Sequence, residues 1–432
     1  MGGIMRLFWA LGWAVLAFGA SDDWARWRGP FETGMARGGA PVTWSATENI
    51  AWKTAIPGRG FSSPVLWGDK IFLTTAVPAK EVQAEGGGGG RGAGGGAASG
   101  VEHRFLLMAI DRGTGQVIWE RTAVTATPHE GYHRKYGSFA SNSPVTDGRI
   151  VYAFFGSRGL YAYDLDGKLV WKKESPPMRM RNQFGEGTAA VLYEDKLILS
   201  CDQESDSFIA VLDKKTGKEL WRKSRDEVSA WSQPLVVEHQ GRKQMIVAAS
   251  AKVRAYDLNN GDLIWECGGL GTNVIPAPVT HGGMVFVMSG HREPNLLAIK
   301  LGRTGDLTGT DAVAWTNQRG NSYTPSPVLH DGKLYFVTDN GMISCFDIKT
   351  GKPFYHQVRL PKPYNFKASP VGADGKLYLS TEQGDILVVK MGEQFEVLAT
   401  NSMGEEFFVA SPAVVDGKLY LRSATALYAV GK

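Results

Sequence analysis

The stretch "HEGYH", His129–His133, has the spacing of the HExxH motif of zinc-dependent hydrolases. In that motif a helix places both histidines on one face, with the glutamate beside the metal-bound water. Here Pro128 precedes the motif, Gly131 interrupts it, and the preceding "RTAVTAT" is typical of a strand. We therefore expect a loop whose side chains form hydrogen bonds, with zinc hydrolysis as the alternative.

A glycine-rich run, "EGGGGGRGAGGGAASG" at 85–100, is the next candidate, because glycine-rich loops can bind phosphate. Such a loop needs a strand before it and a helix after it, and no helix is expected here. The run also cannot bury enough apolar area to offset the entropy lost on ordering. We interpret it as a disordered surface loop.

Charged side chains gather in "RMRNQFGEG" (179–187), "CDQESDSF" (201–208) and "SRDEVSAW" (224–231). The first two stretches supply Arg179, Arg181, Glu186, Asp202, Glu204 and Asp206. Mixed charges on surface loops usually pair or face water. The alternative is that these charged side chains contact a ligand or a protein.

The overall charge is nearly balanced, since 47 basic and 43 acidic residues give a net charge of +4. This balance argues against nucleic acid or an anionic membrane surface as the partner. The cysteines, Cys201, Cys267 and Cys345, lie far apart, each in a predicted strand or at its end. We expect buried small apolar residues rather than a disulfide framework.

The secondary-structure elements that position these side chains recur along the chain as a repeat. Eight copies of a pattern resembling "SPVLHDGKLYFVT" begin at 62–75, 142–155, 188–201, 232–237, 276–289, 325–338, 368–381 and 410–423. In each copy Pro-Val opens a short strand, Asp-Gly or Gly-Asp marks a tight hairpin, and "KLYFV" alternates as a second strand. A third strand ends in Asp before a glycine turn, and a fourth ends in Trp, as in "LLMAIDRGTGQVIWE".

Four antiparallel strands repeated every 40–50 residues indicate a propeller blade. We predict an all-β, eight-bladed β-propeller forming a single domain over 20–432. The segment "NIAWKTAI" around Trp52 reads as a fourth strand with no blade before it, whereas the last copy has three strands. We expect these two fragments to complete one blade, which ties the chain ends together and removes an exposed sheet edge.

The first residues read as an export signal, with Arg6 as the basic region and Leu7–Phe18 as a short apolar region. We expect cleavage after Gly19, a signal peptide over 1–19, and a periplasmic or secreted mature chain. An uncleaved anchor is the alternative. No later segment is long and apolar enough for a transmembrane span.

The repeat of this chain resembles the pyrroloquinoline-quinone (PQQ) type repeat of quinoprotein alcohol dehydrogenases and of the assembly lipoprotein BamB. The best copies are "AIDRGTGQVIW" (109–119) and "VLDKKTGKELW" (211–221), and "DWARWRGP" (23–30) is similar to the opening of exported bacterial PQQ-like propellers. The repeat occurs on both enzymes and scaffolds. The dehydrogenases carry adjacent cysteines over the cofactor, and BamB carries a lipid-anchored cysteine after its signal. This chain has no Cys-Cys pair, and its first cysteine is Cys201.

In a propeller, residues just before the inner strands converge at one mouth of the central channel. Reading upstream of each inner strand gives Arg59, Glu186, Trp231, Asn273, Asn321, Tyr323, Asn365, Lys367 and Glu406. Glu186 and Asn273 are of the chemical type that binds Ca²⁺. Arg59 and Lys367 could hold the anionic quinone that the resemblance implies. A solvated channel rim is the simpler interpretation.

Our leading hypothesis is a non-catalytic binding or scaffold protein, without a cofactor and monomeric, for a protein or carbohydrate partner. The alternative implied by the resemblance is a quinoprotein oxidoreductase. It would use Ca²⁺-bound PQQ to oxidise an alcohol or sugar, with Glu186 as the catalytic base.

Overall fold

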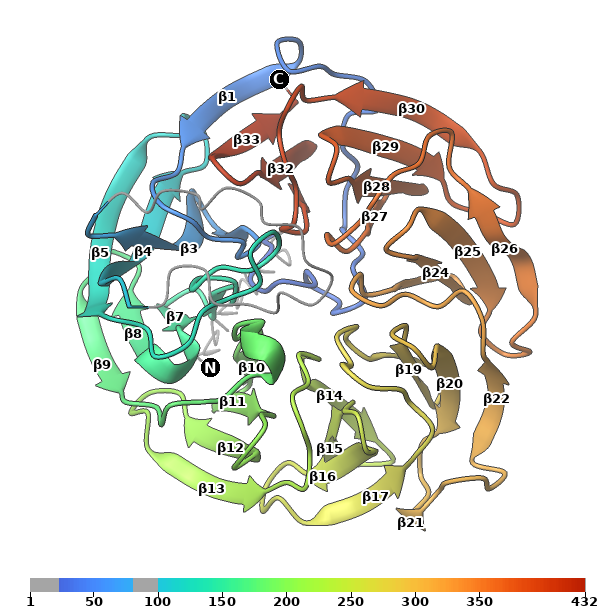
Figure 1. The fold of residues 1–432 in the computed structure, drawn as a ribbon. Coiled ribbons are helices and arrows are strands. Elements are labelled where there is room, and N and C mark those ends of the chain that lie inside the picture. The colour runs from blue at the N-terminus through green and yellow to red at the C-terminus, as the bar shows by residue number, and fades with distance from the viewer. Residues whose placement is uncertain (1–22, 81–99, 432) are drawn as a thin grey trace, which may run out of the picture.

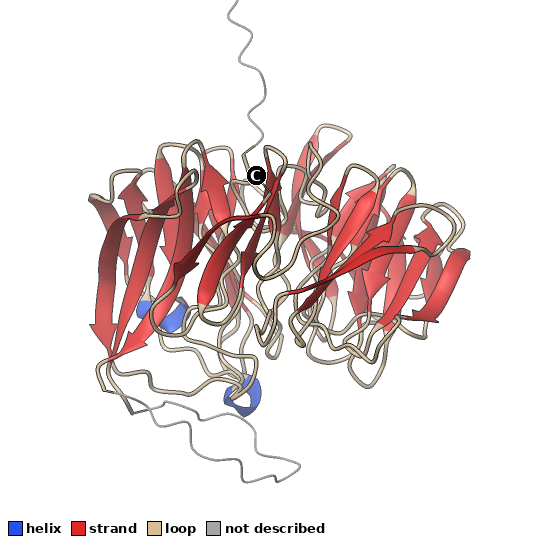
Figure 2. Cartoon of the chain, turned by 90° about the horizontal axis from the view of Figure 1, so that it is seen from above, coloured by secondary structure: helices blue, strands red, loops and turns tan. Residues whose placement is uncertain are grey.

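The computed structural model describes residues 23–80 and 100–431. Within them the strands form eight sheets placed around a central axis as a closed propeller (Figure 1). Figure 2 shows the blades standing side by side, with both short helices, η1 (Gly156–Arg158) and η2 (Arg181–Gln183), on one face of the ring. The predicted architecture is confirmed. The expected signal peptide and residues 85–99 of the glycine-rich run lie outside the described residues.

Each blade is an antiparallel meander whose strands follow one another outward from the axis (Figure 1). Blade 1 comprises β2 (Val65–Trp67), β3 (Lys70–Pro78), β4 (His103–Asp111) and β5 (Val117–Ala126). Blade 2 comprises β6 (Val145–Thr146), β7 (Ile150–Phe154), β8 (Leu160–Asp164) and β9 (Leu169–Lys173). Blade 3 comprises β10 (Val191–Tyr193), β11 (Lys196–Cys201), β12 (Phe208–Asp213) and β13 (Glu219–Ser224). Blade 4 comprises β14 (Leu235–His239), β15 (Arg242–Val247), β16 (Val253–Asp257) and β17 (Leu263–Cys267), with β21 (Gly305–Asp306) parallel to its outer edge.

The remaining blades follow the same order. Blade 5 comprises β18 (Val279–His281), β19 (Met284–Ser289), β20 (Asn295–Lys300) and β22 (Val313–Asn317). Blade 6 comprises β23 (Val328–His330), β24 (Lys333–Val337), β25 (Met342–Asp347) and β26 (Pro353–Arg359). Blade 7 comprises β27 (Val371–Ala373), β28 (Lys376–Ser380), β29 (Asp385–Lys390) and β30 (Val397–Ser402). Blade 8 comprises β31 (Ala413–Val415), β32 (Lys418–Arg422), β33 (Ala426–Val430) and β1 (Ile50–Ala55).

Blade 8 confirms the predicted closure. Strand β1 pairs antiparallel with β33, and Lys53 lies opposite Tyr428. The segment that opens the first repeat therefore completes the last sheet (Figure 1). This pairing covers the outer edge of β33, which an unclosed ring would leave exposed.

The Asp–turn–Trp pattern of the repeat joins neighbouring blades. In blade 1 the Asp111 carboxylate accepts a hydrogen bond from the Thr114 N–H at 2.7 Å, and Gly115 adopts a φ of 75°. The indole of Trp52, from blade 8, donates to the Arg112 carbonyl at 3.0 Å. A Cβ on Gly115 would lie 2.6 Å from the Trp52 ring, so glycine serves both the turn and the contact between blades.

This contact recurs around most of the ring. The indole N–H donates to the carbonyl after the turn aspartate in four further pairs: Trp119 to Leu165, Trp171 to Lys214, Trp221 to Leu258, and Trp315 to Ile348. Trp265 departs from the pattern, because it is buried and donates to the Gln244 Oε1 atom of its own blade at 2.9 Å. The repeated tryptophan thus fixes the spacing between successive sheets, as a ring wedged between blades should.

The inner strands are linked by a second set of contacts, which we call the serine ladder. Around the axis, one backbone N–H donates to the next serine Oγ in five steps: Ala277 to Ser326 (2.9 Å), Ser326 to Ser369 (2.9 Å), Ser369 to Ser411 (3.0 Å), Ser411 to Ser63 (2.9 Å) and Ser63 to Ser143 (2.8 Å). Blades 3, 4 and 5 carry Ala189, Gln233 and Ala277 at this position, so no serine Oγ continues the ladder between Ser143 and Ser326.

Residues 24–36, which we call the plug, lie against the inner strands within the channel. The carbonyls of Trp24 and Ala25 accept hydrogen bonds from β2 and β6, and the carbonyl of Gly34 accepts one from β27. The buried Arg28 guanidinium donates to the carbonyls of Pro327 (2.7 Å) and Pro370 (3.2 Å). The plug therefore contacts blades 1, 2, 6 and 7. From the sequence, "DWARWRGP" is interpreted only through a family resemblance, and its position inside the channel is not predicted.

The expected burial of Cys201, Cys267 and Cys345 is confirmed, and all three are free thiols. None of the helices in 23–80 and 100–431 is long and apolar enough to span a membrane.

Candidate functional site

A cavity of about 580 Å³ opens at the mouth of the channel. Part of its lining comes from the start of the inner strands, including Ser63, Ser369 and Ser411, and part from the loops between blades. Its aromatic lining comprises Trp27, Phe61, His133, Tyr136, Phe184, Trp231, His291 and Tyr323. Trp27 belongs to the plug and donates its indole N–H to the Ser411 Oγ atom at 3.1 Å, so the plug forms part of the cavity wall.

The connection between β5 and β6, residues 127–144, reaches across this mouth, and we call it the mouth loop. Arg59 holds it by donating to the carbonyls of Gly137 (2.9 Å), Arg134 (3.0 Å) and Lys135 (2.9 Å). The Lys135 ammonium pairs at 2.8 Å with the carboxylate of Glu382 in blade 7. The loop therefore links blades 1 and 2 to blade 7.

The "HEGYH" residues lie in the mouth loop and are not helical. The His129 imidazole donates from Nε2 to the Met178 carbonyl (2.8 Å) and accepts at Nδ1 from Arg158 (2.6 Å). The Glu130 carboxylate accepts from the Met180 N–H at 2.9 Å. Among the described residues no group of three His, Cys, Asp or Glu side chains could hold a metal ion. These side chains tie the mouth loop to the connection before blade 3.

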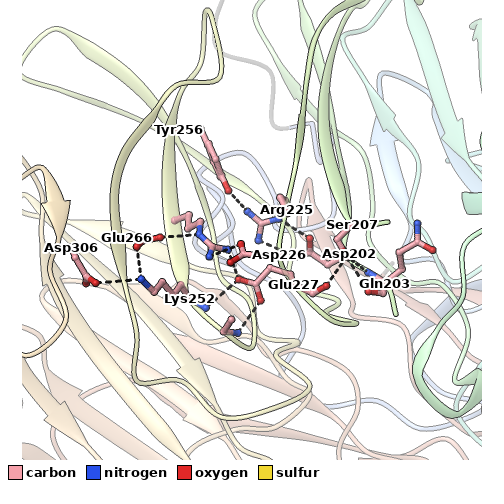
Figure 3. Close-up of polar contacts among 12 residues, drawn as sticks. Asp202, Gln203, Ser207, Arg225, Asp226, Glu227, Lys252, Tyr256, Glu266 and Asp306 are labelled. Atoms are coloured by element: carbon pink, nitrogen blue, oxygen red, sulfur yellow. Dashed lines mark hydrogen bonds and ion pairs between the residues drawn. The ribbon is translucent and has the colours of Figure 1, made fainter. Parts of the chain in front are cut away.

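Trp231 is positioned by the connection between β13 and β14. Its backbone N–H donates to the Val274 carbonyl and its indole N–H to the Gly185 carbonyl, both at 2.8 Å. The start of this connection is anchored by Arg225, whose guanidinium makes a two-pronged contact with Asp202 at 2.7 and 3.1 Å (Figure 3). Both side chains are buried, so the pair fixes the backbone that leads to Trp231.

Glu227 extends this network toward the edge of blade 4 (Figure 3). Its carboxylate pairs with Arg254 at 2.6 Å and accepts from the Lys252 N–H at 3.1 Å. Lys252 in turn pairs with Glu266 and, at 3.3 Å, with Asp306 of β21. Several charges of 201–208 and 224–231 therefore pair with charged side chains of blades 3 and 4, as expected.

Glu186 lies on the blade 3 side of the cavity. Its carboxylate accepts from the Ser157 N–H at 2.6 Å and from the Ser157 hydroxyl at 2.5 Å. This approach needs a glycine at 156, because a Cβ there would lie 1.5 Å from a Glu186 carboxylate oxygen. Burial raises the pKa of Glu186 to about 7, although the two hydrogen bonds act in the opposite direction.

The wall formed by blades 4 to 6 carries a chain of polar side chains. Arg181 donates to the Asn273 Oδ1 atom at 3.2 Å, and the Asn273 Nδ2 atom lies 3.5 Å from the Tyr323 hydroxyl. The Tyr323 ring lies 5.0 Å from the His291 ring, between centroids. Arg292 also lines the cavity. This wall therefore combines aromatic faces, an amide and cations.

Lys367 occupies the opposite wall, and acidic groups neutralise it. Its ammonium lies 2.6 Å from the Asp339 carboxylate and 3.6 Å from that of Glu382. It also lies 4.5 Å from the centroid of the Tyr136 ring, a cation–π distance. Its charge is therefore already partnered within the protein.

The two histidines that line the cavity, His133 and His291, have lowered pKa values because they are buried and lie near cations. Burial lowers the pKa of His133, and the cations of Lys367, Lys135 and Arg59 lower it further. Burial likewise lowers the pKa of His291, with a further contribution from Arg292 and Arg181. Both imidazoles are therefore neutral at pH 7.

The sequence-predicted mouth residues divide into two groups. Five of them line the cavity: Glu186, Trp231, Asn273, Tyr323 and Lys367. The other four do not: Arg59 supports the mouth loop, Asn321 is buried against Asn317, Asn365 is exposed, and Glu406 bonds the Tyr428 hydroxyl. These four lie outside the lining because strand register gives a residue's height along the channel, but not the direction of its side chain.

Sequence reasoning also missed several lining residues. His133, Tyr136 and Phe184 come from long connections that fold back over the mouth, and no strand register predicts them. Gln233 could have been found, because it stands where most copies have serine before the Pro-Val start.

Comparison with known proteins agrees with the propeller fold. The profile of the family described as outer membrane protein assembly factor BamB matches residues 103–357, more than half of the chain. Comparison with curated protein sequences gives no match.

Solved structures share the fold at low identity. BamB from Moraxella catarrhalis is 13% identical with a TM-score of 0.58, covering 87% of this chain and 98% of its own. The quinohemoprotein alcohol dehydrogenase from Comamonas testosteroni is 13% identical with a TM-score of 0.61, covering 95% of this chain and 81% of its own. The computationally designed Ika8 protein is 12% identical with a TM-score of 0.58, covering 87% and 98%.

Proposed function

Because this chain belongs to that family of BamB-like propellers, we propose that it is an exported, non-catalytic binding protein that holds a short carbohydrate in the channel-mouth cavity. The observation that carries this proposal is the lining, which combines aromatic rings with the amides of Asn182, Gln233 and Asn273. Aromatic faces suit the C–H face of a sugar ring, and amides suit its hydroxyls. A volume of about 580 Å³ is within the range of small-molecule sites.

The dehydrogenase alternative requires Ca²⁺ and PQQ, and the donors at the mouth do not fit them. Calcium takes six to eight oxygen ligands, and the Glu186 carboxylate oxygens are already bonded to Ser157. The Asn273 Oδ1 atom accepts from the Arg181 guanidinium, which would repel a cation there. The cations expected to hold an anionic quinone are also engaged, Arg59 with backbone carbonyls and Lys367 with Asp339. We therefore assign no step of chemistry to this site.

A titration of the purified protein with short neutral and acidic oligosaccharides, followed by calorimetry and tryptophan fluorescence, tests the proposal. We expect saturable binding with at least one probe, weakened at least tenfold in Trp231→Ala. The matched control is Trp67→Ala, a half-buried tryptophan outside the cavity, which should bind normally.

A parallel titration with PQQ and Ca²⁺, followed by dye reduction with alcohols and sugars, separates the two functions. We expect no quinone-dependent turnover. Turnover that disappears in Glu186→Gln would establish the oxidoreductase instead.

A further inference from the structure

The cations around the cavity are compensated unevenly. On one side Lys367 and Lys135 are matched by Asp339 and Glu382. On the other side Arg181 has the neutral Asn273 as its side-chain partner, and Arg292 has no ion-pair partner among the described residues. The side of the cavity around Asn273 and Arg292 therefore carries positive charge that no ion pair among the described residues compensates.

Arg292 lines the cavity, and Arg181, which is not part of the lining, donates to the lining residue Asn273. Both guanidinium groups influence His291, whose ring packs against Tyr323. A guanidinium has five N–H donors in a planar fork, and those of Arg292 match the two oxygens of a carboxylate.

The cavity wall also contains a buried hydrogen-bond acceptor, the side-chain oxygen of Gln233. The Gln233 Oε1 atom is buried and has no hydrogen-bond partner among the residues that the structure describes. It lines the cavity two residues after Trp231, where the serine ladder is interrupted. A buried acceptor without a partner destabilises the protein, and a ligand hydroxyl that donates to it would remove this cost.

From these observations, and resting on the proposed function, we infer that the bound carbohydrate is acidic. A uronic acid unit places its carboxylate at Arg292, on the side where Arg181 adds positive charge through Asn273, its ring face on Trp231, and a hydroxyl against Gln233. The acid group thus lies on the side of blades 4 and 5, away from the paired lysines. This orientation follows from the position of the uncompensated charge.

Matched ligands test this inference on the intact protein. Trimers of galacturonate, glucuronate and mannuronate are titrated by calorimetry beside the methyl ester of each, which has the same skeleton without the charge. We expect at least tenfold tighter binding of one acid than of its ester in 50 mM salt. We expect the preference to shrink in 300 mM salt, because screening weakens a charge contact.

Two variants locate the acid group. Arg181→Gln and Arg292→Gln should each reduce affinity for the acid at least fivefold and leave affinity for the ester unchanged. Arg179→Gln is the control, because this arginine is exposed and nearby in sequence, and, unlike Arg181, its guanidinium makes no hydrogen bond to a lining residue among the described residues. Circular dichroism on each variant confirms that the fold is retained.

The outcomes separate the two proposals. Equal binding of acid and ester, or an acid preference that survives in both arginine variants, overturns the inference and leaves the carbohydrate-binding function in place. Failure of all acids and esters to bind overturns both.

Discussion

Blades 6, 7, 8, 1 and 2 and blades 3, 4 and 5 are built from the same repeat but differ at the axis. In the first group serines form the ladder, and the plug lies against their inner strands. In the second group Ala189, Gln233 and Ala277 replace serine. Ala189 and Gln233 line the cavity together with the serines Ser63, Ser143, Ser369 and Ser411 of the first group. This position in the repeat thus decides whether a blade offers a hydroxyl acceptor to its neighbour.

This difference shows how a ring of similar blades can hold a site on one side. On the plug side, Arg28 donates to two backbone carbonyls and the ladder serines accept backbone N–H groups, and these contacts stabilise the ring. On the other side, the buried Gln233 Oε1 atom has no partner among the described residues and can accept a hydrogen bond from a ligand. The two sides of the ring therefore differ in what their inner strands contribute.

The largest expected effect comes from comparing two tryptophans, one on each side. Trp24 of the plug is fully buried, so Trp24→Ala should lower the free energy of unfolding by about 3–5 kcal/mol. Trp231 is only partly buried, and Trp231→Ala should cost about 1 kcal/mol while abolishing ligand binding. Urea unfolding measures both stabilities. Similar losses in the two variants would contradict the division between the sides.

The next effect concerns Glu186 and pH. Its pKa is about 7 in the folded protein and 4.5 in an unperturbed carboxyl, so between these values only the folded state keeps the proton. Stability therefore falls as pH rises from 4.5 to 7, by at most about 3 kcal/mol at 1.36 kcal/mol per pKa unit. Glu186→Gln should lack this fall. Urea unfolding at pH 5 and pH 8 measures it as the difference between the wild type and the variant.

The smallest effects test the ladder itself. Ser369→Ala removes the acceptor of the buried Ser326 N–H and should cost about 1–3 kcal/mol. The same unfolding assay measures this loss, and no loss would show that the ladder contributes nothing to stability.

The opposite substitution would extend the serine ladder from blade 2 into blade 3. Ala189→Ser offers an Oγ acceptor to the Ser143 N–H and should stabilise by about 0.5–1.5 kcal/mol, the net value of one hydrogen bond. A destabilised Ala189→Ser variant would indicate that the blade 2 to blade 3 spacing differs from that of the ladder blades.

The sequence by itself determined the ring and its closure. The turn aspartate, the glycine and the tryptophan act over short, fixed spacings, and most copies repeat the same local contacts. The pairing of the Trp52 segment with the last copy followed from counting strands. The sequence also predicted five residues of the cavity lining, because strand register sets their height along the channel.

Only the tertiary structure decided which residues line the cavity. The plug, the mouth loop and the partners of Glu186 depend on contacts between residues far apart in the chain, for which no local pattern exists. The Lys135–Glu382 pair, for example, joins segments 247 residues apart. A repeat specifies what is common to its copies. The site arises where the copies differ and where non-repeating segments fold back over them.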